Sequence, residues 1–194
     1  EESDLTKSLV KPYIPRFPRH ISYDLVLFGS WRRKGVYVES GKQIASPGSY
    51  PVAGFNFAPM YNLNYKLRFG VSLDGVYDGS ANVYTEDALV EYDAGSGSSR
   101  RKFLVPGIQN QLALGLSGRA EYVMPFFTIG VGLGTNVLGR GDLRGLYQVF
   151  ALKINVTRSS FLHIGYNLQD FQTPNYLMLG LGFRFNNKYP KVRH

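Results

Sequence analysis

Hydrophobic and polar residues alternate with a period of two along most of the chain. In the clearest segment, residues 175–185, every second residue is large and apolar, and the residues between are mostly small or polar. This period is typical of β-strands, because successive side chains of a strand point to opposite faces of a sheet. Seven further segments repeat the pattern: residues 21–31, 53–63, 65–74, 111–122, 127–134, 149–156 and 161–168.

The lengths of these segments favour a membrane barrel. Most are near the roughly 9–11 residues that cross a bilayer at a tilt. A closed antiparallel barrel is the sheet form that leaves no unpaired strand edge in lipid. No run of 18 or more apolar residues exists, so a transmembrane helix is not expected. We therefore predict an all-β fold, an eight-stranded antiparallel transmembrane β-barrel.

The second face of the predicted strands combines charged side chains with many small residues. Its charged members are Asp24, Lys66, Arg68, Asp74, Arg119, Glu121, Lys153 and Arg184. Glycine and alanine between them would make room for long side chains in a narrow lumen. We predict that the large apolar face contacts lipid and that the ions pair inside a filled polar lumen. A soluble barrel with the apolar face inside is the alternative, because its strands alternate equally.

Short and long connections between the predicted strands alternate. Short links fall near residues 62–64, 124–125 and 157–160, and long ones at 33–49, 78–109, 139–145 and 169–174. Outer-membrane barrels have short periplasmic turns and longer external loops. This predicts a bacterial outer-membrane location with both termini in the periplasm.

Aromatic residues near the strand ends suggest interfacial girdles, although ordinary strand propensity explains many of them equally. They are Tyr23, Trp31, Tyr50, Tyr61, Tyr65, Tyr77, Tyr122, Tyr147, Phe161 and Phe185.

Composition narrows the chemistry. The chain of 194 residues has no cysteine and a formal net charge of +8. Disulfides and cysteine-ligated metals are excluded, and His20, His163 and His194 are too scattered to suggest a metal site. No cofactor is expected. The basic residues of the strands form no continuous stripe, so nucleic acid is not an expected partner, whereas anionic lipid headgroups are.

The pattern divides the chain into three parts. Residues 1–19 are expected to be a proline-rich basic periplasmic leader, 20–186 the barrel, and 187–194 a short basic periplasmic tail. The acidic start, Glu1-Glu2-Ser3-Asp4, resembles a mature end left after processing.

Two stretches carry a resemblance to a known family. They are DLVLFGSWRRKGVYV at residues 24–38 and FLHIGYNLQDFQTPNYLMLGLGFRF at 161–185. From about His20 to Phe185 the chain resembles the lipid A deacylase family, whose Bacteroidetes branch is labelled acyloxyacyl hydrolase. The resemblance implies an eight-stranded outer-membrane barrel among lipids that include lipopolysaccharide. Pro174-Asn175 is similar to the family's loop before the last strand.

The same resemblance implies a histidine general base, a serine nucleophile two positions later on the penultimate strand, and a carboxylate on the last strand. Spacing from Pro174 places Gly165 at the histidine position and Asn167 at the serine position. A register shifted by two aligns His163 with the histidine, but Gly165 then replaces the serine. Neither register supplies a hydroxyl, and residues 176–185 contain no Asp or Glu.

His163 is therefore the one candidate catalytic residue, and membership of a polar luminal network is the alternative for it. We predict a non-catalytic outer-membrane barrel, an accessory subunit of a larger assembly such as barrel-insertion or secretion machinery. A lipid A acyl-ester hydrolase that uses His163 and an unrecognised nucleophile is the alternative. A passive pore is a third hypothesis, which eight strands disfavour because side chains fill so narrow a lumen.

Overall fold

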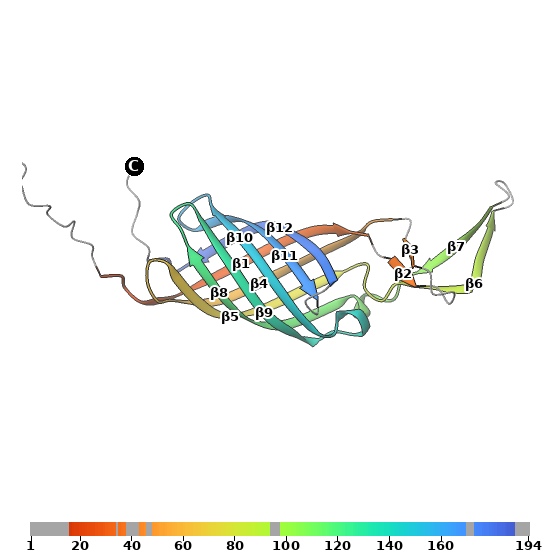
Figure 1. The fold of residues 1–194 in the computed structure, drawn as a ribbon, viewed down its shortest axis with the longest axis horizontal. Helices are drawn as coiled ribbons and strands as arrows, with labels where there is room; N and C mark the ends of the chain where they lie inside the picture. Colours follow the sequence, from red (N-terminus) through yellow and green to blue (C-terminus); the bar gives the residue numbers. More distant parts are fainter. Residues whose placement is uncertain are drawn as a thin grey trace, which may run out of the picture.

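Eight antiparallel strands close into one barrel in the computed structural model, which describes residues 16–33, 35–37, 43–45, 48–93, 98–169 and 173–188. The barrel strands are β1 (His20–Arg32), β4 (Tyr50–Asn62), β5 (Leu67–Asp78), β8 (Leu112–Val123), β9 (Phe127–Leu138), β10 (Leu146–Asn155), β11 (Ser160–Gln169) and β12 (Thr173–Phe185). Neighbours follow the order β1-β12-β11-β10-β9-β8-β5-β4, and β4 pairs with β1 to close the wall (Figure 1). The predicted fold class is confirmed.

Two hairpins lie outside the barrel wall, within connections that the sequence predicted only as loops. β2 (Gly35–Tyr37) pairs with β3 (Gln43–Ala45), and β6 (Tyr84–Asp93) pairs with β7 (Ser98–Leu104). Both leave the same end of the barrel, and the β6–β7 hairpin points away from it (Figure 1). Two 3-10 turns, η2 (Ile108–Asn110) and η3 (Gly141–Leu143), lie in the connections that lead into β8 and β10. The described part of the chain contains no helix long and apolar enough to cross a membrane.

The two ends of the barrel differ. The connections β4–β5, β8–β9 and β10–β11 are tight turns, and they share one end, the short-turn end, with the start of β1 and the finish of β12. The opposite end, the long-loop end, carries both hairpins. Lys66, expected in the lumen, is exposed in the β4–β5 turn. The turn includes it because Asn64 Oδ1 accepts hydrogen bonds from the backbone N–H groups of Lys66 and Leu67, both at 2.8 Å.

The distribution of side chains between the two faces of the wall is the predicted one. Large apolar residues are exposed on the outside of every barrel strand; examples are Leu27, Phe57, Phe69, Leu116, Val131, Phe150, Ile164 and Leu179. The buried residues inside include many polar and charged ones; examples are Ser22, Asp24, Asn62, Arg68, Glu121, Lys153 and Arg184. This arrangement suits a barrel with lipid outside and a polar interior. The soluble alternative, with its apolar face inside, is not adopted.

Two of the aromatic residues predicted for the girdles face the lumen instead. Tyr147 and Phe161 are buried. Glycines make the space for them: a Cβ added at Gly134 would lie 2.6 Å from Tyr147 Cζ, and one added at Gly182 would overlap the Phe161 ring. Tyr23 is exposed on the outer face, where its ring stacks on Phe57 at 6.2 Å between centroids.

Candidate functional site: the barrel lumen

Five charged residues from five strands form a buried luminal ion network. They are Asp24 of β1, Arg68 of β5, Glu121 of β8, Lys153 of β10 and Arg184 of β12. Three cations thus share two carboxylates. Two of its ion pairs, Asp24–Arg184 and Arg68–Glu121, join neighbouring strands, and the others join strands that are not neighbours in the wall.

Asp24 is the centre of this network. Its Oδ2 accepts hydrogen bonds from Arg68 Nη2 and Lys153 Nζ, both at 2.8 Å, and its Oδ1 accepts one from Arg184 Nε at 2.9 Å. Glu121 binds two of the same cations: Arg68 Nε donates to Oε2 at 2.6 Å, and Lys153 Nζ lies 2.7 Å from Oε1. Each charge therefore has at least one opposite partner, which buried ions require.

An aromatic ring covers the cationic side of the network. Lys153 Nζ lies 5.0 Å from the centroid of the Phe161 ring, and Arg184 Cζ lies 5.1 Å from it. Both separations suit cation–π attraction, which grows when the cation is desolvated. The ring thus adds a second kind of partner for two of the three cations, which together outnumber the two carboxylates of the network.

A second polar cluster centres on Asp74 of β5. Its carboxylate accepts hydrogen bonds from five side chains at 2.5–3.0 Å: Asn56, Ser72, Ser117, Arg119 and Tyr147. Only one of these donors, Arg119, is a cation. Nearer the long-loop end, Arg32 Nη1 donates to Asp78 at 2.8 Å, and Ser80 donates to the same carboxylate.

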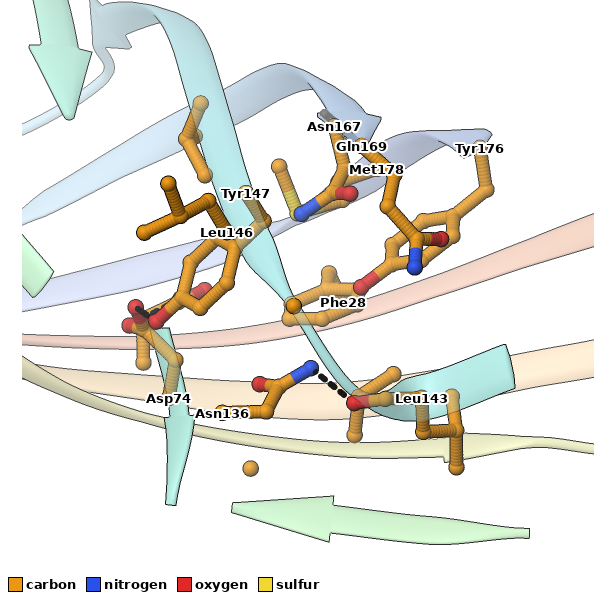
Figure 2. Close-up of a pocket in the computed structure, with 15 residues that line it drawn as sticks. Phe28, Asp74, Asn136, Leu143, Leu146, Tyr147, Asn167, Gln169, Tyr176 and Met178 are labelled. Atoms are coloured by element: carbon orange, nitrogen blue, oxygen red, sulfur yellow. Dashed lines mark hydrogen bonds between the residues drawn. The ribbon is translucent and has the colours of Figure 1, made fainter. Parts of the chain in front are cut away.

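An apolar layer of the lumen lies beside the Asp74 cluster. Its buried members are Phe28, Val52, Tyr147, Val149, Ala151, Tyr176 and Met178. Figure 2 shows Tyr147 reaching Asp74, with Phe28, Tyr176 and Met178 around the same space. The free volume of this cavity is about 30 Å³. That volume holds water but not an acyl chain.

His163 of β11 points into the lumen and is only 3% exposed. In the strand pairing it lies directly opposite Lys153 of β10 on one side and Gly180 of β12 on the other. Neither ring nitrogen has a hydrogen-bond partner among the described residues. The sequence therefore predicted its luminal position correctly, but the structure gives it no bond to a nucleophile or to an orienting carboxylate within the described chain.

The positions predicted for the serine and the carboxylate hold no such groups. Gly165 and Asn167 face the lumen beside His163, and a Cβ added at Gly165 would lie 2.7 Å from His163 Nε2. Inside the lumen, His163 therefore lies next to Gly165, which occupies the serine position when the comparison with the family is shifted by two residues. Pro174, predicted in a loop, pairs with Leu168 inside β12, where the register shifts. Among the described residues no group of His, Asp and Glu side chains could hold a metal ion.

The sequence did not predict that Asp74 would gather five donors or that Tyr147 would be one of them. Tyr147 reads as an interfacial aromatic because it lies one residue from the start of β10. The signal that identifies it is the pair Gly115 and Gly134: an added Cβ would lie 2.7 Å from the Tyr147 hydroxyl at the first position and 2.6 Å from Cζ at the second. Luminal glycines therefore mark the places where a large neighbour enters the lumen.

A closed eight-stranded wall, apolar on the outside and ion-paired within, defines a β-barrel of the outer-membrane class. The chain belongs to the family described as "Acyloxyacyl hydrolase, C-terminal domain", which matches residues 21–187. No curated protein matches the sequence.

Two solved structures are similar in part. Ail, the attachment invasion locus protein of Yersinia pestis, has 15% sequence identity and a TM-score of 0.42, over 85% of this chain and 98% of that chain. Neisserial surface protein A has 15% identity and a TM-score of 0.39, over 85% of this chain and 95% of that chain. The assignment as a barrel rests on the strand pairing of this chain, not on these similarities.

Proposed function

We propose that this chain is a non-catalytic outer-membrane barrel that serves as an accessory subunit of a larger outer-membrane assembly. The non-catalytic part of this proposal rests on the surroundings of His163. A serine hydrolase needs its nucleophile within about 2.6–3.2 Å of the base. The residue two positions after His163 is Gly165, and glycine has no group that can attack an ester.

Access supports the same proposal. His163 is buried inside the wall, whereas the acyl esters of a membrane lipid lie outside it. The outer face of β11 carries Leu162, Ile164 and Tyr166 at the same level. To reach His163, a lipid ester would have to enter a lumen whose cavity has a free volume of only about 30 Å³. The geometry therefore favours a structural role for this histidine.

The shape of the long-loop end supports the accessory role. The β6–β7 hairpin extends beyond the barrel (Figure 1), and a two-stranded hairpin on its own is only marginally stable in water. A partner that packs against it would stabilise it. The barrel then acts as the anchor, and the hairpin as the contact. With both termini in the periplasm, as proposed, this contact lies on the outer side of the membrane.

A native purification tests the accessory role. The full chain, extracted in mild detergent, is expected to bring one or more partners at a fixed stoichiometry. Replacement of residues 84–104 by a short glycine-serine linker should release them, while replacement of residues 34–47 serves as the matched control at the same end. A barrel that purifies alone from its native membrane contradicts the accessory role.

The hydrolase alternative is favoured by the family match and by the ring of His163, which has no hydrogen-bond partner in the described part of the chain. It predicts that expression removes one acyl chain from lipid A, a loss that mass spectrometry detects directly. The non-catalytic proposal predicts an unchanged lipid A mass, both for the natural chain and for His163→Ala. A mass loss that disappears in His163→Ala would establish the hydrolase instead.

A further inference from the structure

The short-turn end of the barrel carries a basic rim, which consists of four exposed cations. They are Arg19 before β1, Lys66 in the β4–β5 turn, Arg158 in the β10–β11 turn and Lys188 after β12. Among the residues whose side chains the structure describes, no exposed Asp or Glu lies at this end. The long-loop end differs, because the sequence of β6 alone contains four acidic residues. The short-turn end is therefore the one that attracts anions.

The basic rim follows neighbouring strands of the wall. In the closed strand order, β11 is followed by β12, then by β1 and then by β4. Arg158, Lys188 and Arg19 therefore stand beside three successive strands, and Lys66 stands beside the fourth. The β8–β9 turn, across the barrel, contains no charged residue. Like charges gathered on one side of the barrel repel one another unless an anion lies between them.

Hydrogen bonds hold three members of the basic rim on one support. The backbone N–H of Lys188 donates to His20 Nε2 at 3.3 Å, which leaves His20 Nδ1 as the donor to Pro18 O at 2.8 Å. Arg158 Nη2 donates to Asn187 O at 3.3 Å, and Asn187 Nδ2 donates to Arg158 O at 2.8 Å. His20 is buried. The chain before β1, the chain after β12 and the β10–β11 turn are thus joined to one another.

Exposed apolar side chains lie close to these cations on the outer face of the wall. Ile21 of β1 comes two residues after Arg19, and Phe185 of β12 comes three residues before Lys188. Both are exposed, as is Phe183 of β12. The basic rim therefore lies at the boundary between the apolar belt and the polar turns. At such a boundary Lys and Arg meet the phosphates of lipid headgroups.

We propose that the basic rim binds an anionic glycerophospholipid with two phosphates, of the cardiolipin class, from the periplasmic leaflet. Arg19, Arg158 and Lys188 surround its phosphates, and an acyl chain lies against Ile21 and Phe185. Two phosphates on one molecule can pair with cations beside several strands, which a lipid with one phosphate cannot do as well. The choice of leaflet rests on the proposed orientation, with both termini in the periplasm. The site lies outside the lumen, and it binds without hydrolysis.

Native mass spectrometry of the detergent-solubilised barrel, titrated with cardiolipin, tests this assignment. In Arg158→Gln/Lys188→Gln the affinity should fall by about tenfold or more, because two of the cations that attract the phosphates are lost. Arg140→Gln/Arg144→Gln removes the same charge from exposed positions at the long-loop end and should leave the affinity unchanged. Equal binding by the first variant and the natural chain would disprove the site.

Two further variants separate charge from support. Arg158→Lys/Lys188→Arg keeps both charges and should retain most of the affinity; a loss as large as in the glutamine variant would show that charge is not the cause. His20→Ala keeps every cation of the basic rim but removes the acceptor of the Lys188 N–H, so it should also weaken cardiolipin binding. Unchanged affinity in His20→Ala would contradict the support.

The choice of lipid is tested on the natural chain. Phosphatidylglycerol, with one phosphate, should bind more weakly than cardiolipin, and phosphatidylethanolamine, with no net charge, more weakly still. Equal affinity for cardiolipin and phosphatidylglycerol would overturn the assignment of a lipid with two phosphates, and equal affinity for all three would overturn the headgroup site. Partners recovered in the native purification should be the same for Arg158→Gln/Lys188→Gln, so failure of this site is distinguishable from failure of the accessory role.

Discussion

Asp24 is the residue on which the luminal ion network depends, because it binds three cations. Asp24→Asn would leave Arg68, Lys153 and Arg184 buried around one carboxylate, Glu121. Loss of one partner from a buried ionic group costs about 3–5 kcal/mol. We expect the free energy of unfolding to fall by about that amount, measured by urea titration in lipid vesicles with the single tryptophan, Trp31, as reporter.

Asp74→Asn is the matched comparison for that variant. Asp74 binds one cation, Arg119, and four neutral donors, so the change removes one ion pair instead of three. The loss of stability should be clearly smaller than for Asp24→Asn. Equal losses in the two variants would show that the number of buried cations does not set the cost.

Gly182 of β12 leaves room for the Phe161 ring in the lumen, because a Cβ added at this position would overlap that ring. The ring also contacts Lys153 and Arg184, so it cannot shift without disturbing the ion network. Gly182→Ala should destabilise the barrel by about 1–3 kcal/mol, the usual cost of overpacking. Gly107→Ala is the control, since nothing lies within 4 Å of a Cβ there. The same urea titration compares them, and indistinguishable midpoints would contradict the packing argument.

The sequence predicted which charges face the lumen better than it predicted their partners. The alternation of apolar and polar residues along each strand was enough to place Asp24, Arg68 and Glu121 in the lumen. Their pairing depends on which residues of different strands lie at the same height in the lumen. The lengths of the turns and the closure of the barrel set those heights. The five donors around Asp74 come from four strands, so no pattern within one strand could identify them.

At the scale of elements, strands with an apolar side toward lipid were predictable and hairpins in solvent were not. The barrel strands alternate strictly because one face must be apolar throughout. The β6–β7 hairpin has no such constraint, and its register shifts between Thr85 and Val90. The boundary of β5 was missed for a local reason: Asn64 closes the turn and keeps Lys66 outside.

The β6–β7 hairpin should be dispensable for the fold, because the closed strand order does not include it. A variant with residues 84–104 replaced by a short linker is expected to fold into vesicles as the natural chain does. The measurement is the change in electrophoretic mobility on heating, with the tryptophan fluorescence of Trp31 as a second probe. Failure of this variant to fold would show that the hairpin takes part in barrel assembly.

At the scale of the whole molecule, the ionic groups block the lumen at three levels. The luminal ion network, the Asp74 cluster and the Arg32–Asp78 pair each bridge different strands, and the apolar layer around Phe28 lies among them. An ion passing through would have to displace paired charges, which is costly in a buried setting. The lumen is therefore a core that holds the wall together, in keeping with the narrow interior of eight strands.

The filled lumen predicts that the natural chain forms no steady channel. In planar bilayers, fully inserted protein should give no stable conductance steps above the background of protein-free membranes. The double variant Asp24→Asn/Asp74→Asn weakens two of the three levels, so brief current fluctuations should increase in it before any steady step appears. Stable, uniform steps in the natural chain would mean that the paired charges part readily and leave an aqueous path, and the role of the lumen as a core would then be wrong.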